Sequence, residues 1–173
     1  MTIFLCGFMG CGKSTIGSKL AKKLEMDFVD MDSYIEEQAE MTIPQIFEKY
    51  GESHFRDLET QAVQDLSGRE GVIACGGGAM LREVNAEIAR KSGQVVLLDV
   101  PFRTCYFRIA DSDRPIVRRS TKQQLNQLYD ERYVIYEKHC THKVDVSRSI
   151  NAAVRNIIIA LGIPVSEEKE NLC

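Results

Sequence analysis

The sequence lacks the features that mark a membrane protein or a nucleic-acid-binding protein. No apolar run reaches the roughly 18 residues of a membrane span, and no charged segment followed by an apolar one opens the chain as in a secretory leader. The net charge is only −3, from 22 basic and 25 acidic residues, so no excess of positive charge favours nucleic acid or an anionic membrane. We therefore expect neither nucleic acid nor a membrane as a partner.

The six cysteines also lack the C-x-x-C spacing of a zinc ribbon or a dithiol redox site. Three of them lie in or beside apolar strand or helix patterns, where a reduced thiol packs as a small apolar group. We therefore expect free thiols and a cytoplasmic protein. A cluster of His139, Cys140 and His142 lacks the second ligand pair of a zinc finger, and we interpret it as a solvated helix end.

No internal repeat, low-complexity tract or linker divides the chain. A length of 173 residues with 44% hydrophobic residues suits one domain with a full core. We therefore predict a single domain over residues 1–173, with a polar tail that frays from about residue 165 to 173.

Short apolar runs alternate with segments of helical spacing along the whole chain. Most of the runs show no polar alternation, which is typical of strands buried on both faces of a parallel sheet. This pattern predicts a three-layer α/β fold with a five-stranded parallel sheet between helices. The predicted strands are TIFLC (2–6), DFVD (27–30), GVIAC (71–75), QVVLLDV (94–100) and KVDV (143–146). The predicted helices cover about 14–24, 33–40, 43–50, 52–67, 80–92, 102–111, 123–140 and 149–161.

The stretch GFMGCGKST lies directly between the first predicted strand and the first predicted helix. It matches G-x-x-x-x-G-K-[ST], the P-loop pattern. Its glycines let backbone N–H groups converge on a phosphate, and the following helix adds unpaired donors and the positive end of its dipole. We expect Lys13 to reach the β- and γ-phosphates of ATP and Ser14 to offer its hydroxyl to Mg²⁺. The predicted ATP-binding loop contains Gly10, Cys11, Gly12, Lys13, Ser14 and Thr15.

Two carboxylates follow in the stretch VDMD. If the second strand runs through it, Asp30 and Asp32 lie on the same face at the carboxyl end of the strand, where α/β folds bind ligands. One would hold the water shell of the metal, and the other would accept or orient the proton of a substrate hydroxyl. The alternative is that the strand ends in a turn, where Asp is a common helix N-cap. The spacing alone does not decide between them.

Two further motifs are consistent with an anionic acceptor. In GESHFRDLE, Glu52 and Glu59 lie four residues before and three after Arg56 on one helical face. This arrangement is either a solvated salt-bridge ladder or a rigidly held arginine that binds a substrate carboxylate. The glycines of CGGG, at 76–78, allow backbone N–H groups to approach a ligand closely, although a flexible turn would have the same composition.

The stretch FRIADSDRPIVRR lies between two helical patterns, and we expect Pro115 to bar a regular helix through it. We interpret residues from about 111 to 123 as a mobile lid. Its closure would bring Arg114 over the γ-phosphate and exclude water. Arg132, on the next predicted helix, is a second candidate for binding an anionic acceptor.

These motifs, in this order and over nearly the whole chain, resemble the shikimate kinase family. The resemblance implies transfer of the γ-phosphoryl group of MgATP to the 3-hydroxyl of shikimate, in the pathway to aromatic amino acids. It also implies the fold of the nucleoside-monophosphate kinases. We expect a monomer with shikimate and ATP as its partners.

The resemblance also implies roles for individual residues. It makes Lys13, Asp32 and Arg114 catalytic, and it gives Mg²⁺ to Ser14 directly and to Asp30 through water. Shikimate would be bound by Asp32, Arg56, Glu59, Gly76, Gly77, Gly78 and Arg132, with the two arginines on its carboxylate and the Gly77 backbone on a ring hydroxyl. Arg108 and Arg148 match positions near the adenine of ATP.

Competing functions use the same residues less completely. A GTPase would need a D-x-x-G motif and a guanine-reading N-K-x-D motif. Asp65 to Gly68 match the first and His142 to Asp145 match half of the second, but Asp65 ends a helical run and Asp145 lies within a strand pattern, so we interpret both as chance matches. A nucleotide kinase or a gluconate-type kinase is closer. A non-catalytic nucleotide-binding regulator would keep the P-loop without requiring Asp32, Arg114 and two acceptor arginines.

Overall fold

The structure, a computed structural model, describes residues 1–112 and 115–164. Its centre is a five-stranded sheet in the order β2-β3-β1-β4-β5, and every neighbouring pair is parallel. The strands are β1 (Thr2–Cys6), β2 (Asp27–Asp30), β3 (Gly71–Ala74), β4 (Gly93–Asp99) and β5 (His142–Asp145). The predicted three-layer α/β fold is confirmed.

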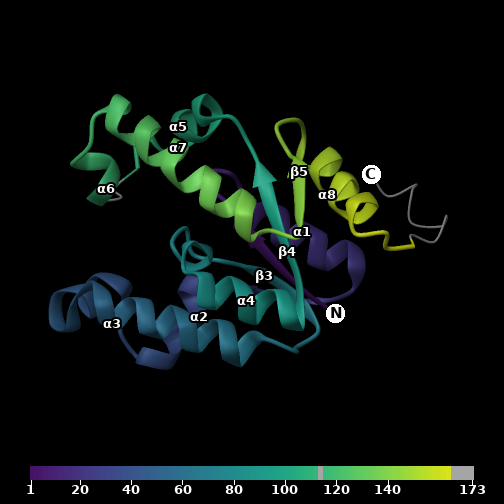
Figure 1. Ribbon diagram of the computed structural model, residues 1–173, viewed down its shortest axis with the longest axis horizontal. Coiled ribbons are helices and arrows are strands. Elements are labelled where there is room, and N and C mark those ends of the chain that lie inside the picture. Colours follow the sequence, from purple (N-terminus) through teal and green to yellow (C-terminus); the bar gives the residue numbers. More distant parts are fainter. Residues whose placement is uncertain (113–114, 165–173) are drawn as a thin grey trace.

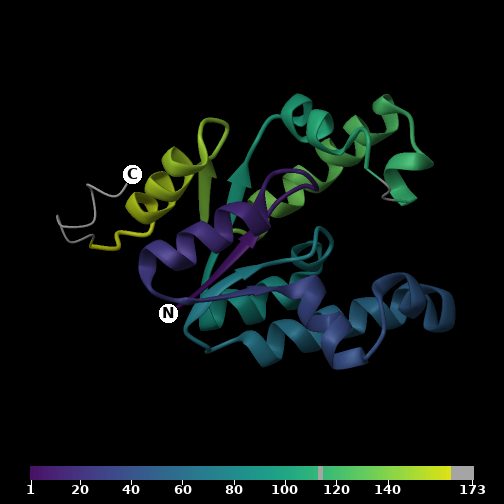
Figure 2. The ribbon, with the colours of Figure 1, turned by 180° about the vertical axis from the view of Figure 1, so that it is seen from behind.

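Helices cover both faces of this sheet (Figures 1 and 2). One face carries α1 (Lys13–Leu24) and α8 (Ile150–Ala160), and the other carries α3 (Ile43–Leu66), α4 (Glu83–Ser92) and the second half of α7 (Lys122–His139). The shorter helices are α2 (Met31–Ala39), η1 (Ala79–Leu81), α5 (Phe102–Ile109) and α6 (Pro115–Arg118).

Side chains of β1 alternate between the two layers, as the two-residue period of a strand requires. Ile3 and Leu5 pack with the α1 and α8 side of the core, whereas Phe4 and Cys6 pack with the α3 and α4 side. All five residues of the strand are buried. The P-loop therefore follows a strand that is fixed on both faces and on both edges, between β3 and β4.

Local sequence signals set several helix ends. Thr42 begins α3 through a capping box with Gln45, as the sequence indicates, and Thr121 begins α7 in the same way with Gln124. The break between the two helices predicted over 43–50 and 52–67 is confirmed, because α3 consists of two helical segments that meet at Gly51, whose backbone is non-helical with a φ of 81°. Gly51 tolerates that left-handed backbone because it has no Cβ.

The structure describes only part of the segment after α5. The expectation that no regular helix runs through this stretch is confirmed in the described residues, because α5 ends at Ile109 and α6 is a separate helix that begins at Pro115. Proline is favoured at the first position of a helix, where its missing N–H is not needed. Arg114 of the predicted lid and the predicted tail over 165–173 lie outside the described residues. Within the described ranges, none of the helices has the length and apolarity that crossing a membrane requires.

Candidate active site

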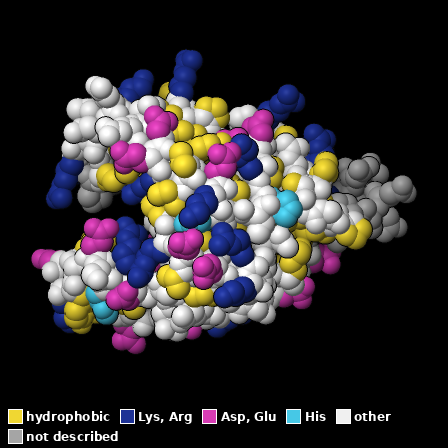
Figure 3. All heavy atoms as spheres, viewed as in Figure 1, with side chains coloured by type: hydrophobic (Ala, Val, Ile, Leu, Met, Phe, Trp, Pro, Cys, Tyr) yellow, Lys and Arg dark blue, Asp and Glu magenta, His cyan; other side chains and the backbone are white. Residues whose placement is uncertain are grey.

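The P-loop lies between the end of β1 and the start of α1, and it borders an open cavity of about 210 Å³. Figure 3 shows the molecule hollowed between the helices at upper left and α3 at lower left, with basic side chains at the lower lip. The cavity is lined by Met9, Gly10, Gly12, Lys13, Ser14, Thr15, Asp30, Asp32, Cys75, Gly77 and Arg108. P-loop residues, both predicted carboxylates and the middle glycine of CGGG therefore line the same cavity.

Lys13 is folded back over the P-loop. Its Nζ donates hydrogen bonds to the carbonyl oxygens of Gly7 (2.9 Å) and Phe8 (3.2 Å). These contacts hold the ammonium over the loop, where a polyphosphate oxygen can replace a carbonyl as its acceptor. Cys11 is the one predicted ATP-loop residue that does not line the cavity: its side chain is 1% exposed and packs in the core.

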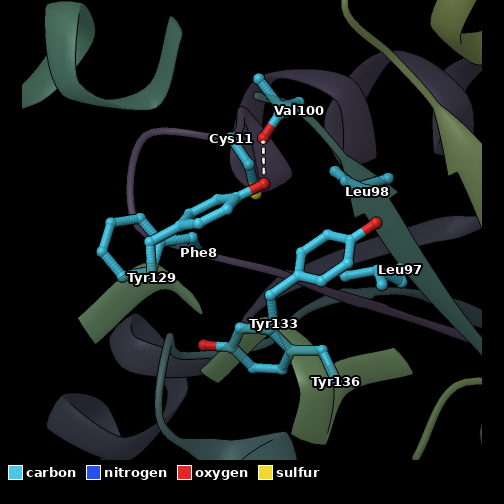
Figure 4. Close-up of a pocket in the computed structure, with 8 residues that line it drawn as sticks. All are labelled: Phe8, Cys11, Leu97, Leu98, Val100, Tyr129, Tyr133 and Tyr136. Atoms are coloured by element: carbon cyan, nitrogen blue, oxygen red, sulfur yellow. Dashed lines mark hydrogen bonds between the residues drawn. The ribbon is translucent and has the colours of Figure 1, made fainter. Parts of the chain in front are cut away.

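Figure 4 shows the tightly packed pocket on the core side of the P-loop, lined by Phe8, Cys11 and three tyrosines of α7. The Phe8 ring meets the Tyr129 ring edge-on, with 5.3 Å between their centroids. The Tyr129 hydroxyl donates to the carbonyl of Val100 (2.8 Å), shown as the dashed line. The P-loop is thus packed directly against the helix that carries Arg132.

The two carboxylates do not share a strand, so the first of the two interpretations of VDMD is wrong. β2 ends at Asp30, which is the N-cap of α2 and accepts the backbone N–H of Asp32 (3.2 Å). The alternative interpretation, a strand that ends at an Asp cap, is the correct one. Asp32 stands in the first turn of α2, and both residues still line the cavity.

Asp30 is also hydrogen-bonded to Ser14, the predicted direct ligand of the metal. The Ser14 hydroxyl donates to Asp30 Oδ2 (2.6 Å). A hydroxyl and a carboxylate at one edge of a phosphate cavity are hard oxygen donors of the kind that Mg²⁺ prefers. The donor set therefore fits this ion, with phosphate oxygens and water available to complete its coordination.

Arg56 forms both predicted ion pairs. Its NH2 lies 2.8 Å from Glu52 Oε1 and its NH1 lies 2.7 Å from Glu59 Oε2. The two partners differ, since the Glu52 side chain is 67% exposed and that of Glu59 only 1%. Burial raises the pKa of Glu59 and Arg56 opposes that shift. A buried carboxylate on one side makes Arg56 a rigidly held cation rather than a member of a solvated ladder.

Close approach explains two of the three glycines of CGGG. A Cβ on Gly76 would lie 2.6 Å from Asp32 Oδ1, and a Cβ on Gly78 would overlap the guanidinium of Arg56. A Cβ on Gly77 would meet nothing within 4 Å, and this residue lines the cavity. Gly76 and Gly78 therefore make room for the two functional side chains, and Gly77 faces open space.

Arg132, on α7, lies beside Tyr136. Burial raises the pKa of the neighbouring Tyr136 phenol, and the Arg132 guanidinium acts in the opposite direction. The Tyr136 hydroxyl, which Figure 4 shows turned away from the other two tyrosines, donates to the carbonyl of Gly77. Arg56 thus lies against the CGGG turn from α3, and Tyr136, the neighbour of Arg132, bonds to the turn from α7.

The predicted adenine residues have different positions. Arg108, on α5, lines the cavity and donates to the carbonyl of Gly10 (3.0 Å). Arg148 is exposed in the turn after β5 and is not among the residues that line the cavity.

Sequence reasoning missed two side chains behind the CGGG turn. His139 is 2% exposed, so its interpretation as part of a solvated helix end is wrong, and its Nδ1 lies 2.9 Å from the carbonyl of Met80. Asn85 is fully buried on α4 and donates to the carbonyl of Ala79 (2.8 Å). Neither belongs to a motif, so only the packing of the helices reveals them.

A P-loop at the end of the central strand, a hydroxyl–carboxylate pair whose oxygens fit Mg²⁺ and an arginine paired with a buried carboxylate near an open glycine turn define a P-loop kinase for a small anionic acceptor. The comparisons specify it further. The family model described as shikimate kinase matches residues 9–162. The chain belongs to the shikimate kinase family.

Individual relatives agree over most of their length. The chain is 42% identical over 146 residues to a shikimate kinase of Clostridium botulinum (strain Alaska E43 / Type E3), which covers 84% of this chain and 87% of the relative. The crystal structure of the Aquifex aeolicus enzyme matches with a TM-score of 0.84 at 37% identity, over 94% of this chain and 96% of that one. The Acinetobacter baumannii enzyme in complex with shikimate matches with a TM-score of 0.85 at 33% identity, over 95% of each chain.

Proposed function

We propose a division of labour among these residues for the reaction of the family. The chain is an enzyme that transfers the γ-phosphoryl group of ATP to the 3-hydroxyl of shikimate, giving 3-phosphoshikimate and ADP in the pathway to aromatic amino acids. The observation that carries the assignment of the acceptor side is Arg56, held by a buried carboxylate against the CGGG turn beside the phosphate cavity.

On the donor side, the P-loop backbone binds the ATP phosphates and Lys13 moves from the loop carbonyls to the β- and γ-phosphates. Ser14 and Asp30 hold Mg²⁺, Ser14 directly and Asp30 through water. When bound, this ion neutralises charge on the transferring phosphoryl group. Arg108 binds near the adenine, supported by its contact with Gly10. We assign Arg114 to the phosphates and Arg148 to the adenine from the family resemblance alone.

On the acceptor side, Arg56 and Arg132 bind the shikimate carboxylate from two helices, and Glu59 keeps Arg56 oriented. The backbone of Gly77 contacts a ring hydroxyl, which its open position supports. The 3-hydroxyl then lies between Asp32 and the γ-phosphate, since Asp32 lines the same cavity as Lys13 and Ser14.

Asp32 orients the 3-hydroxyl or accepts its proton while that oxygen forms a bond to the γ-phosphorus. The bond from the γ-phosphorus to the β,γ-bridging oxygen breaks, and ADP leaves with the electron pair. Lys13 stabilises the charge that develops on the phosphoryl oxygens. Because the site fixes both reactants, most of the rate enhancement comes from positioning and charge stabilisation.

We also propose that the enzyme is a cytoplasmic monomer with a lid over about 111–123. The described cysteines are free thiols, as is common in a reducing compartment. Size-exclusion chromatography with light scattering tests the monomer: an apparent mass near 39 kDa, twice the 19.5 kDa of the chain, would contradict it.

A coupled ADP-release assay with MgATP tests the function. The acceptors are shikimate, quinate, gluconate and nucleoside monophosphates, with a reaction that has no acceptor as the control. We expect ADP release that depends on shikimate. Release with gluconate or a nucleotide instead would keep the donor side and overturn the acceptor assignment, and acceptor-independent ATP binding without release would favour a regulator.

A further inference from the structure

Buried polar side chains are concentrated behind the acceptor side of the site. In the described part of the chain, the buried polar or charged residues are Thr2, Glu59, Asn85 and His139, each at most 2% exposed. Glu59 holds Arg56, as shown above. Asn85 and His139 both face the stretch from Gly76 to Leu81, which we call the acceptor loop. Since burying polar groups is costly unless they are hydrogen-bonded, their shared position needs an explanation.

Three side chains donate to three carbonyls of the acceptor loop. The Tyr136 hydroxyl donates to Gly77, the Asn85 amide to Ala79 (2.8 Å) and His139 Nδ1 to Met80 (2.9 Å). A carbonyl oxygen only accepts hydrogen bonds, so the hydrogen of the His139 contact must lie on Nδ1. The acceptor loop is therefore fixed from behind by α4 and α7, and the bonds leave its front open to the cavity.

The other end of Asn85 reaches the helix that carries Arg56. Asn85 Oδ1 accepts from the Thr60 hydroxyl at 2.7 Å. Thr60 has one hydroxyl hydrogen, and the carbonyl of Arg56 is farther from it at 3.1 Å. The Arg56 carbonyl instead accepts a hydrogen bond from Arg82 NH1, at 2.8 Å. The Asn85 amide thus links the acceptor loop to α3 at the turn that follows Arg56.

We infer that Asn85 and His139 are positioning residues of the acceptor site. They hold the acceptor loop so that the Gly77 backbone faces the ring hydroxyl of the acceptor and Gly78 stays beside the Arg56 guanidinium. The inference rests on the proposed function, since it assigns shikimate to this loop. Neither side chain lines the cavity, so each acts through the loop and not on the substrate.

The test compares variants that keep side-chain shape. Asn85→Leu and His139→Leu remove the donors. His139→Asn keeps a donor where Nδ1 lies, because the Asn amide nitrogen is the same number of bonds from Cα. Thr2→Val is the matched control: it removes a buried hydroxyl that donates to the carbonyl of Arg69, at the opposite end of β1 from the P-loop. Steady-state kinetics with each substrate, calorimetric titration with shikimate and thermal unfolding are measured for every variant.

We expect both leucine variants to raise KM and Kd for shikimate about tenfold, the effect of one lost hydrogen bond to a buried carbonyl. KM for ATP should not change. His139→Asn should restore KM for shikimate, and Thr2→Val should lower Tm alone. The inference is overturned if the leucine variants resemble Thr2→Val, or if KM rises equally for both substrates.

Two controls keep the result interpretable. If a leucine variant does not fold, Thr60→Val removes the outer partner of Asn85 at a partly buried position, and an unchanged KM for shikimate there would also refute the inference. Wild-type protein without shikimate-dependent ADP release would refute the proposed function itself. If the wild-type protein releases ADP in the presence of shikimate and the variants have an unchanged KM for shikimate, only the positioning role is refuted.

Discussion

Replacing Glu59 by Gln should weaken shikimate binding without destabilising the fold. The carboxylate is 1% exposed and lies 2.7 Å from Arg56 NH1, so the substitution keeps the shape and removes the charge. Arg56 then has at most a neutral amide oxygen in place of the charged partner that fixes its orientation against Gly78. At the same time, the cost of burying the Glu59 charge disappears, a cost that is visible in the raised pKa of this carboxyl.

The size of the effect follows from the two partners of Arg56. A hydrogen bond to a charged group contributes about 1.5–3 kcal/mol. Glu52 remains in place at 2.8 Å, although its side chain is 67% exposed. We therefore take the lower end of the range, about 1.5 kcal/mol, which corresponds to roughly a tenfold increase in Kd for shikimate. The control Glu52→Gln removes an exposed pair worth about 0–1 kcal/mol and should change Kd by less than about fivefold.

Calorimetric titration with shikimate, together with thermal unfolding, checks both parts of the prediction. Equal, small effects of Glu59→Gln and Glu52→Gln on Kd would show that burial of Glu59 is irrelevant to the orientation of Arg56. A large fall in Tm for Glu59→Gln with an unchanged Kd would show that the buried pair serves the fold alone.

The pH dependence of stability gives a second readout for the same carboxyl. Burial raises the pKa of Glu59 above its ordinary value of 4.5, so the folded state binds this proton more tightly than the unfolded chain does. Its contribution to the free energy of unfolding therefore falls as pH rises from the ordinary value through the raised one. Gln does not titrate, so we expect the stability of the variant relative to wild type to increase over this pH window, and differential scanning calorimetry would measure it.

Three further predictions concern the donor side. Lys13→Ala should lower kcat about 10²- to 10³-fold in the coupled assay, because the ammonium stabilises charge that develops on the phosphoryl group; a fall of less than tenfold would contradict that role. Gly10→Ala should lower Tm and impair ATP binding in calorimetry, since its φ is 79° and its Cβ would lie 2.7 Å from the Cys105 carbonyl oxygen; a fully active variant would contradict the geometry. Arg108→Ala should raise KM for ATP about fivefold through loss of its bond to Gly10, and an equal rise in KM for shikimate would contradict a donor-side role.

Features that depend on neighbouring residues could be predicted from the sequence. The P-loop, the strand before it and the capping box of Thr42 and Gln45 are each contained within a few residues, and the structure has all of them. The ion pairs of Arg56 follow from helical spacing in the same way. Helical spacing does not show that Arg56 is rigidly held, because the burial of Glu59 depends on elements far away in the chain.

Features that depend on distant contacts could not be predicted. The end of β2 is set by pairing of Asp30 with Ala74 on β3, so spacing within VDMD could not show that Asp32 belongs to the following helix. His139 is buried because its helix packs on a loop that lies 59 residues earlier in the chain. A histidine between charged and polar neighbours has no local signal for such an environment.

The crossover from β2 to β3 has a consequence for how this enzyme can be altered. It consists of α2 and α3, joins two strands at one edge of the sheet and carries Asp32, Arg56 and Glu59 (Figure 1). Parallel pairing fixes both of its ends, and the entropy of closing a longer or shorter connection changes slowly with its length. One contiguous segment therefore carries three of the proposed acceptor-side residues, and its length and sequence can change without moving the P-loop, while the CGGG turn and Arg132 stay in place as the other half of the acceptor site.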